Sequence, residues 1–250
     1  MNKSFILSAA LFVSSLSISA QSTPRNQLTP TPPMGWMTWN LFQGDISDKL
    51  IRETADAMVE GGYVDAGYKY IFIDDLWQGG RDVHNNMIPD PKKFPNGIKA
   101  LADYVHSKGM KLGIYSDAAQ LTCGGWTASL GFEEQDARTF ASWGIDYLKY
   151  DYCNAPIDSA TARQRYRTMA DALSKSGRDI ALGICEWGQR QCEEWCEEVG
   201  GQLWRTTYDV RDMWKDVTNE GGMGILDIVN ITSPLSSYAR KGQWPDMDML

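Results

Sequence analysis

The sequence has no run of basic residues, and its 250 residues carry a formal net charge of −8. A protein that follows a phosphate backbone needs clustered Lys and Arg, so nucleic acid is not an expected partner. Histidine is equally scarce, since His84 and His106 are the only two. They lie far in sequence from the cysteines, without ligand spacing to them, so neither a metal site nor another cofactor is predicted.

No apolar run reaches the roughly 20 residues that a membrane-spanning helix needs. The first apolar stretch, residues 5–13, follows Lys3 and leads through small residues to Ala20 and Gln21. This pattern is typical of a secretory signal and predicts that residues 1–20 are removed. A membrane anchor is the alternative, but the run is too short for one. We therefore expect an exported chain, periplasmic or extracellular, that is soluble and free of the membrane.

Cysteine is limited to five residues, and disulfides persist in the oxidising compartment that export implies. Cys123 and Cys153 each follow a predicted strand, so they could lie side by side at one rim. Cys185, Cys192 and Cys196 remain, so one of them must stay unpaired or pair outside the chain. Structural bridging is favoured over metal binding.

Alternating strand-like and helix-like segments fill the chain after a polar lead-in at residues 21–33. The strands are short, continuous apolar runs, which are typical of parallel strands covered on both faces. No repeat or low-complexity linker interrupts residues 34–250, which predicts one domain. The predicted strands are 34–39, 68–75, 111–117, 147–153, 180–187, 203–210 and, weakly, 244–250. The predicted helices are 48–61, 98–108, 133–143, 160–174, 193–199 and 212–219.

Carboxylates gather at the ends of these strands: Asp74 and Asp75, Asp117, Asp151, Glu186, Asp209 and Asp248. A doubly wound sheet would spread them along an edge, whereas a (β/α)₈ barrel brings all strand ends to one mouth, where its catalytic groups lie. The glycine-rich phosphate loop expected in the doubly wound fold is also missing. We therefore predict an α/β (β/α)₈ barrel. It lacks an eighth β/α unit, so we expect a fragment or a barrel that a partner closes.

Two of these carboxylates suit hydrolysis of a glycosidic bond, which needs two carboxyl groups flanking the anomeric carbon. Asp151 ends an apolar strand, and Lys149 lies two residues back, where its charge would favour the ionised form of a nucleophile. Asp209 is the candidate acid/base, with a pKa that changes with the charge of its neighbour. Either residue alone could be a helix N-cap. Two of them at one mouth favour catalysis.

Other side chains at the same mouth suit a ligand rich in hydroxyl groups, because sugars are bound by charged hydrogen-bonding groups and an aromatic platform. A ring of structural salt bridges is the alternative. The hydrogen-bonding candidates are Asp74, Asp75, Lys149, Glu186, Arg205 and Asp248, and the platform candidates are Trp39 and Trp187.

From about residue 31 to residue 250, the sequence resembles glycoside hydrolase family 27, which holds α-galactosidases and α-N-acetylgalactosaminidases. The motifs stand in the family's order and spacing. They are Thr31-Pro32-Pro33-Met34-Gly35-Trp36 with Trp39, Ile73-Asp74-Asp75, Gly113-Ile114-Tyr115-Ser116-Asp117 with Cys123, Leu148-Lys149-Tyr150-Asp151-Tyr152-Cys153, Cys185-Glu186-Trp187, and Trp204-Arg205 with Asp209.

The resemblance implies a retaining exo-acting α-galactosidase for oligosaccharides or polysaccharides, with Asp151 as nucleophile and Asp209 as acid/base. It implies that Asp74 and Asp75 bind the 4- and 6-hydroxyls and that Arg205 contacts the sugar near O2 and O3. Further family positions are Trp39, Tyr115 and Cys123 in the pocket, and a disulfide between Cys123 and Cys153.

The substrate and the completeness of the site stay open on this resemblance. Glu186 matches the galactose-selective form and argues against an N-acetylgalactosamine substrate. A β-L-arabinopyranosidase of the same family, or an inactive galactose-binding barrel fragment, is the alternative. Pro245 and Met247 stand where the family usually has Asn and Pro, although Asp248 still aligns as a sugar ligand. The family's eighth barrel unit and C-terminal β-sandwich have no counterpart in the sequence.

Overall fold

The computed structural model describes residues 24–218 and 221–249. Within them, parallel strands form one curved sheet in the order β1-β2-β5-β6-β7-β8-β9, and every neighbouring pair is parallel. The strands are β1 (Gly35–Met37), β2 (Tyr70–Ile73), β5 (Lys111–Asp117), β6 (Tyr147–Asp151), β7 (Ala181–Cys185), β8 (Leu203–Arg205) and β9 (Trp244–Asp246). This arrangement confirms the predicted parallel β/α barrel architecture.

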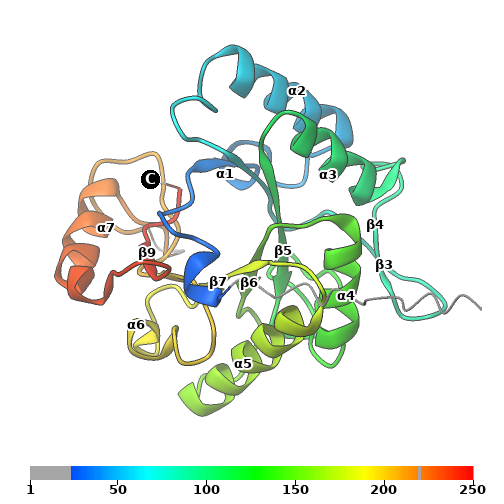
Figure 1. Cartoon of the computed structure of the whole chain (residues 1–250). Helices are drawn as coiled ribbons and strands as arrows, with labels where there is room; N and C mark the ends of the chain where they lie inside the picture. Colours follow the sequence, from blue (N-terminus) through cyan, green and yellow to red (C-terminus); the bar gives the residue numbers. More distant parts are fainter. Residues whose placement is uncertain (1–23, 219–220, 250) are drawn as a thin grey trace, which may run out of the picture.

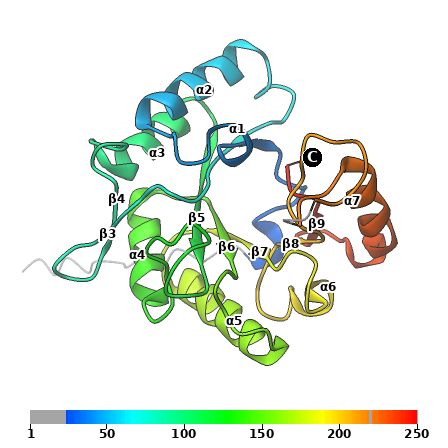
Figure 2. The ribbon, with the colours of Figure 1, turned by 180° about the vertical axis from the view of Figure 1, so that it is seen from behind.

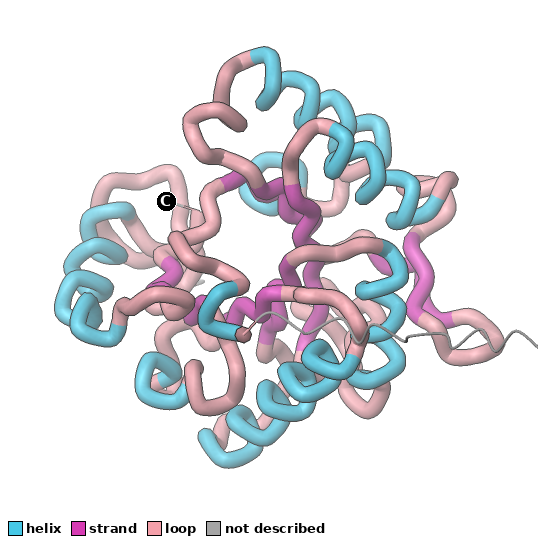
Figure 3. Tube along the Cα trace, viewed as in Figure 1, coloured by secondary structure: helices cyan, strands magenta, loops and turns pink. Residues whose placement is uncertain are grey.

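The helices surround the strands, as Figures 1 and 3 show. The longer ones cover the sheet from β2 to β7 and bury one apolar stripe each, as Ile51, Ala55 and Met58 of α2 illustrate. They are α1 (Trp39–Phe42), α2 (Asp48–Glu60), α3 (Gly97–Ser107), α4 (Glu133–Trp143), α5 (Ser159–Lys175), α6 (Cys192–Trp195) and α7 (Ile225–Thr232), with the 3₁₀ turns η1 (Arg25–Gln27) and η2 (Ser233–Tyr238).

Local signals explain where these helices begin and end. The Ser47 hydroxyl accepts a hydrogen bond from the Leu50 amide at 3.2 Å and caps α2. The Asp158 carboxylate caps α5 in the same way, through the Thr161 amide at 2.8 Å. Helix α4 carries acidic residues in its first turn and ends at Gly144, whose φ of +82° glycine adopts without strain.

Several predicted elements were wrong or incomplete. The helix predicted at 212–219 is absent from its described residues, 212–218, which form a loop, and the helix lies later, at α7. A β-bridge between Val210 and Met223 and a hydrogen bond from the Asp216 amide to Asp227 hold this loop, so tertiary contacts outweigh its helical pattern. The hairpin of β3 (Gln78–Arg81) and β4 (Met87–Pro89) was not predicted.

The strands predicted at 203–210 and 244–250 are shorter than expected, and β8 and β9 have three residues each. Among the described residues no pairing joins β9 to β1, so the sheet is curved and open between them. Figure 2, seen from behind, shows β5, β6, β7 and β8 side by side. The predicted signal segment, residues 1–20, lies outside the described residues. No helix in the described part of the chain is long and apolar enough to span a bilayer.

Candidate active site

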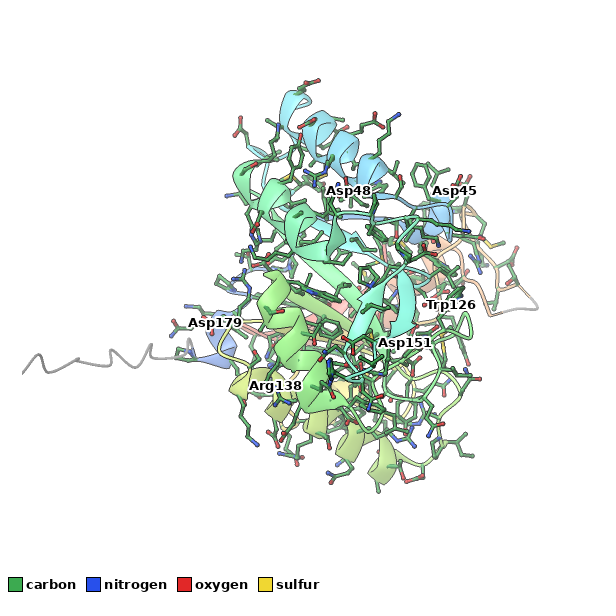
Figure 4. All side chains as sticks on the ribbon, turned by 90° about the vertical axis from the view of Figure 1, so that its right-hand side faces the viewer. Asp45, Asp48, Trp126, Arg138, Asp151 and Asp179 are labelled. Carbon is green, nitrogen blue, oxygen red and sulfur yellow. A yellow bond between two sulfur atoms is a disulfide. The ribbon has the colours of Figure 1, made fainter. Side chains whose placement is uncertain are left out.

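A cavity of about 260 Å³ opens at the carboxyl ends of the strands. Figure 4 shows Asp151 on the side of the molecule that carries Asp45 and Trp126, whereas Asp179, which precedes β7, lies at the opposite side. Most of the predicted site residues line this cavity: Trp39, Asp74, Asp75, Tyr115, Cys123, Lys149, Asp151, Trp187 and Asp209. Tyr208, Arg211, Gly221, Gly222 and Met249 complete the lining.

Asp151 is the last residue of β6, and its side chain is held from two directions. The Tyr152 amide donates to Oδ1 at 2.9 Å, and the Tyr115 hydroxyl donates to Oδ2 at 3.0 Å. The residue is 5% exposed, and burial raises the pKa of the Asp151 carboxyl to about 6 against the opposing charges of Lys149 and Arg205. As the sequence predicts, the charge of Lys149 lowers the pKa of Asp151, but burial raises that pKa by more.

Lys149 makes its direct ion pair with Asp74 instead, with Nζ 2.7 Å from Oδ2. Asp75 is fixed by amides, because Gly124 donates to its Oδ2 at 2.8 Å and Leu76 donates to its Oδ1 at 2.7 Å. Burial raises the pKa of the Asp75 carboxyl. Asp74, Asp75 and Lys149 thus give the cavity a rigid polar wall with both acceptors and a cation.

Asp209 lies beyond the end of β8 and is positioned by a side-chain ion pair. Arg205 bridges two carboxylates: its Nη2 lies 3.0 Å from Asp209 Oδ1, and its Nη1 lies 2.9 Å from Asp248 Oδ1. Burial tends to raise the pKa of Asp209, but the charges of Arg205 and Lys149 outweigh it and leave that pKa lowered. Asp248 also accepts from the Val210 amide at 2.8 Å.

In a simple pair of nucleophile and acid, the acid has the higher pKa. The two candidate catalytic carboxyls show the opposite order. The pKa of Asp151 is raised and that of Asp209 is lowered in the ligand-free cavity. Both carboxyls are mostly ionised at pH 7. Asp209 can act as an acid only when a bound ligand displaces water and raises its pKa, because desolvation disfavours the charged form.

Three predicted ligands lie apart from this cavity. Arg205 and Asp248 line a smaller space of about 70 Å³ inside the sheet. Glu186 lines neither space; it is fully buried and forms an ion pair with Arg190, whose guanidinium lies 4.8 Å above the Tyr152 ring. Burial raises the pKa of Glu186 to about 7, and its Oε1 has no hydrogen-bond partner among the described residues.

Cys123 and Cys153 form a disulfide with Cα atoms 5.1 Å apart, and Cys123 Sγ lies 3.5 Å from Asp151 Oδ2. The bridge links the loops that follow β5 and β6. Cys185, Cys192 and Cys196 are all free and buried, so no second bridge forms among the three. Beside the nucleophile candidate, Asp117 pairs in register with Asp151, and burial raises the pKa of its carboxyl to about 9.

Sequence reasoning missed Tyr208 and Arg211, which line the cavity together with Asp209. Their proximity to Asp209 in sequence was the available signal. Gly221, Gly222 and Met249 had no such signal, because a loop and the segment after β9 bring them to the cavity only in the folded chain.

Comparison with known proteins bears on this site. The family model described as alpha galactosidase A matches residues 31–250. The chain belongs to this family. Alpha-galactosidase A of Cellvibrio japonicus is 48% identical over all of this chain and 62% of its own length. This chain therefore spans about three fifths of that relative's length.

Solved structures agree with this assignment. Alpha-galactosidase I from Mortierella vinacea superposes with a TM-score of 0.86 at 38% identity, over 90% of this chain and 60% of its own. An alpha-galactosidase from Saccharomyces cerevisiae, solved with raffinose, gives a TM-score of 0.86 at 36% identity over 91% of this chain and 54% of its own. The predicted resemblance to the α-galactosidase family is thereby confirmed.

Proposed function

We propose that this chain carries the active site of a retaining exo-α-galactosidase, with Asp151 as the nucleophile and Asp209 as the acid/base. The observation that carries the proposal is a single cavity lined by both carboxylates. Strands that are far apart in sequence supply the two groups, and Asp151 forms no ion pair among the described residues, which a purely structural ring of salt bridges would not explain.

In the first step the Asp151 carboxylate bonds to the anomeric carbon while the bond to the leaving oxygen breaks. Asp209 gives its proton to that oxygen. In the second step Asp209 takes a proton from water, and the water oxygen displaces Asp151 from the anomeric carbon. Loss of the Asp151 charge in the covalent intermediate lowers the pKa of Asp209 for its role as a base.

The polar wall supports a galactosyl group as the bound sugar. Asp74 and Asp75 present carboxylate oxygens, and Lys149 presents a cation. Such groups bind vicinal hydroxyls through charge-assisted hydrogen bonds. Trp39 and Trp187 line the same cavity and suit the apolar face of the ring. The yeast relative solved with raffinose supports an α-galactosyl oligosaccharide as the substrate class.

Glu186 fits a further part of this proposal. Its buried Oε1 has no partner among the described residues, so a sugar 2-hydroxyl that reached it would satisfy it. Its ion pair with Arg190 keeps the other oxygen occupied. In the proposal, Arg205 positions Asp209 through their ion pair, and Asp248 positions the backbone after Asp209 by accepting a hydrogen bond from the Val210 amide. Both residues contact the sugar only when it is bound.

Mechanism-based labelling tests the proposal. A 2-deoxy-2-fluoro α-galactosyl reagent with a good leaving group is expected to label Asp151, as peptide mass mapping would report. Proton NMR of methyl α-galactoside hydrolysis is expected to show the α-anomer of galactose first. A label on Asp209, or the β-anomer first, contradicts the assigned roles. Faster cleavage of a β-L-arabinopyranoside than of an α-galactoside would favour a β-L-arabinopyranosidase.

A catalytically inactive galactose-binding barrel predicts a different result in the same samples. Galactose would raise the melting temperature, but neither labelling nor hydrolysis would occur.

We also propose export of the chain, on the basis of Lys3 followed by the apolar segment 5–13 and of the Cys123–Cys153 disulfide. Mass spectrometry of the N-terminal peptide of the protein recovered from the cell exterior would test this, with Gln21 expected as the first residue.

A further inference from the structure

Two chemically different groups of residues line the cavity. Asp74, Asp75 and Lys149 form the polar wall, in which both carboxylates are buried, and they suit the hydroxyls of the bound sugar. Tyr208 and Arg211 flank Asp209 in sequence and line the cavity with it. In the proposed function Asp209 protonates the leaving oxygen. The side chains around Asp209 therefore border the leaving group.

Tyr208 is an exposed aromatic residue at this border, with 42% of its surface accessible. Its ring lies nearly parallel to that of Trp187, with centroids 6.5 Å apart and an interplanar angle of 16°. The Gln189 side-chain amide donates to the Tyr208 hydroxyl at 2.7 Å. The ring is thus held in place although much of it faces solvent.

The backbone fixes this aromatic pair from the Trp187 side as well. Trp187 has a φ of +53°, which is unfavourable for a bulky residue. The next residue, Gly188, has a φ of +72°, and a Cβ there would lie 2.0 Å from the Thr206 carbonyl oxygen. The segments after β7 and β8 therefore touch, and only glycine permits the contact. Strained backbone of this kind concentrates at ligand sites.

We infer that Tyr208, supported by Trp187, is the platform for the first sugar of the leaving group, and that Arg211 binds hydroxyls of that sugar. The inference rests on the proposed function, and it identifies the substrates as galactosides joined to a pyranose. A preorganised aromatic ring binds the flat C–H face of a pyranose, and a guanidinium adds donors to its hydroxyls. A small alkyl aglycone would use neither group.

Isothermal titration with sulfur-linked ligands tests the inference without turnover. The two ligands are an α-galactosyl unit linked through sulfur to glucose and methyl 1-thio-α-galactoside. The protein is expected to bind the disaccharide about tenfold more tightly, as stacking and hydrogen bonds to one more ring would give. Tyr208→Ala is expected to reduce this affinity ratio to near one. Tyr208→Phe keeps the ring and is expected to retain the ratio within about threefold.

Two further arms separate the chemical classes. Arg211→Met is expected to weaken the disaccharide while phenyl 1-thio-α-galactoside, which has no hydroxyls on its aglycone, keeps its affinity. An equal effect on both ligands overturns the sugar assignment. A ratio of one in the unaltered protein, or an unchanged ratio in Tyr208→Ala, overturns the platform. Failure to bind either galactoside contradicts the proposed function itself, and the inference falls with it.

Discussion

The strands that carry Asp151 and Asp209 differ in how firmly the sheet holds them. Strand β6 pairs over five residues with β5 and with β7, and Asp151 is its last residue. Strand β8 has three residues, with two pairs to β7 and three to β9, and Asp209 lies four residues beyond its end. Asp151 is buried, whereas Asp209 is half-buried.

This difference shows two ways to place a carboxylate at a strand mouth. Backbone pairing fixes Asp151, and burial then raises its pKa to about 6. A charged side chain fixes Asp209, since Arg205 holds it by an ion pair and, with Lys149, outweighs the effect of burial on its pKa. A nucleophile needs a fixed position, whereas an acid/base needs a pKa that can change during the reaction.

The largest expected effect concerns the firmly held carboxylate. Asp151→Asn removes the proposed nucleophile and is expected to lower kcat for a galactoside by about 10⁴-fold or more. Asp117→Asn is the matched control, because Asp117 lies beside it in register and its pKa of about 9 keeps it protonated at pH 7. Steady-state kinetics should show near-normal turnover in the control. Equal losses in both variants would remove the distinction between the two carboxyls.

The effect of losing the proposed acid/base is expected to depend on the leaving group of the substrate. Asp209→Ala should lower kcat/KM for an α-galactosyl disaccharide by about 10²- to 10⁴-fold. An aryl galactoside whose phenol leaves without protonation should lose much less, and added azide should restore turnover as galactosyl azide. Initial rates with both substrates measure the contrast. A loss that is the same for both leaving groups would contradict the role of Asp209.

The ion pair between Arg205 and Asp248 can be tested through the stability of the fold. Arg205→Met leaves Asp248 buried without its cation, and removal of one partner from a buried pair costs about 3–5 kcal/mol. Urea unfolding should show this as a lower midpoint. Lys99→Met provides the comparison, because its pair with Asp103 is exposed at 57% and 59% and should contribute little. Similar midpoints in both variants would show that Arg205 does not secure β8 and β9.

The smallest effect is expected in the pH profile. Catalysis needs Asp151 ionised and Asp209 protonated, whereas in the free cavity Asp151 has the higher pKa, about 6. Above that pH the pair loses the one proton that the reaction needs, so kcat/KM should fall tenfold per pH unit. Tyr115→Phe removes a hydrogen bond that favours the carboxylate, so it should move this limb to higher pH. Rates across neutral and alkaline pH with one galactoside measure this limb in the unaltered protein and in Tyr115→Phe. A limb near the ordinary pKa of aspartate would mean that burial does not control Asp151.

Much of the half of the sheet that contains the longer strands β5, β6 and β7 could be predicted from sequence, because continuous apolar runs end in or beside a carboxylate there. Residues 111–117 and 133–143 were predicted with the bounds that β5 and α4 have. The half that contains the short strands β8 and β9, with the loop between them, was predicted less well. Residues 212–218 carry a helical pattern but fold as a loop, because contacts to Met223 and Asp227 satisfy their backbone. Tyr208 and Arg211 reach the cavity from that same half.

The sequence by itself determined which carboxylates end or follow the strands, and therefore which ones can meet at one mouth. Strand alternation and apolar runs are local properties, so a linear pattern can carry them. Only the tertiary structure decided the charge state and partners of those groups. Lys149 turns to Asp74, 75 residues away, and Arg205 joins Asp209 to Asp248. Burial and nearby charge set a pKa, and both arise from residues that the chain brings together only on folding.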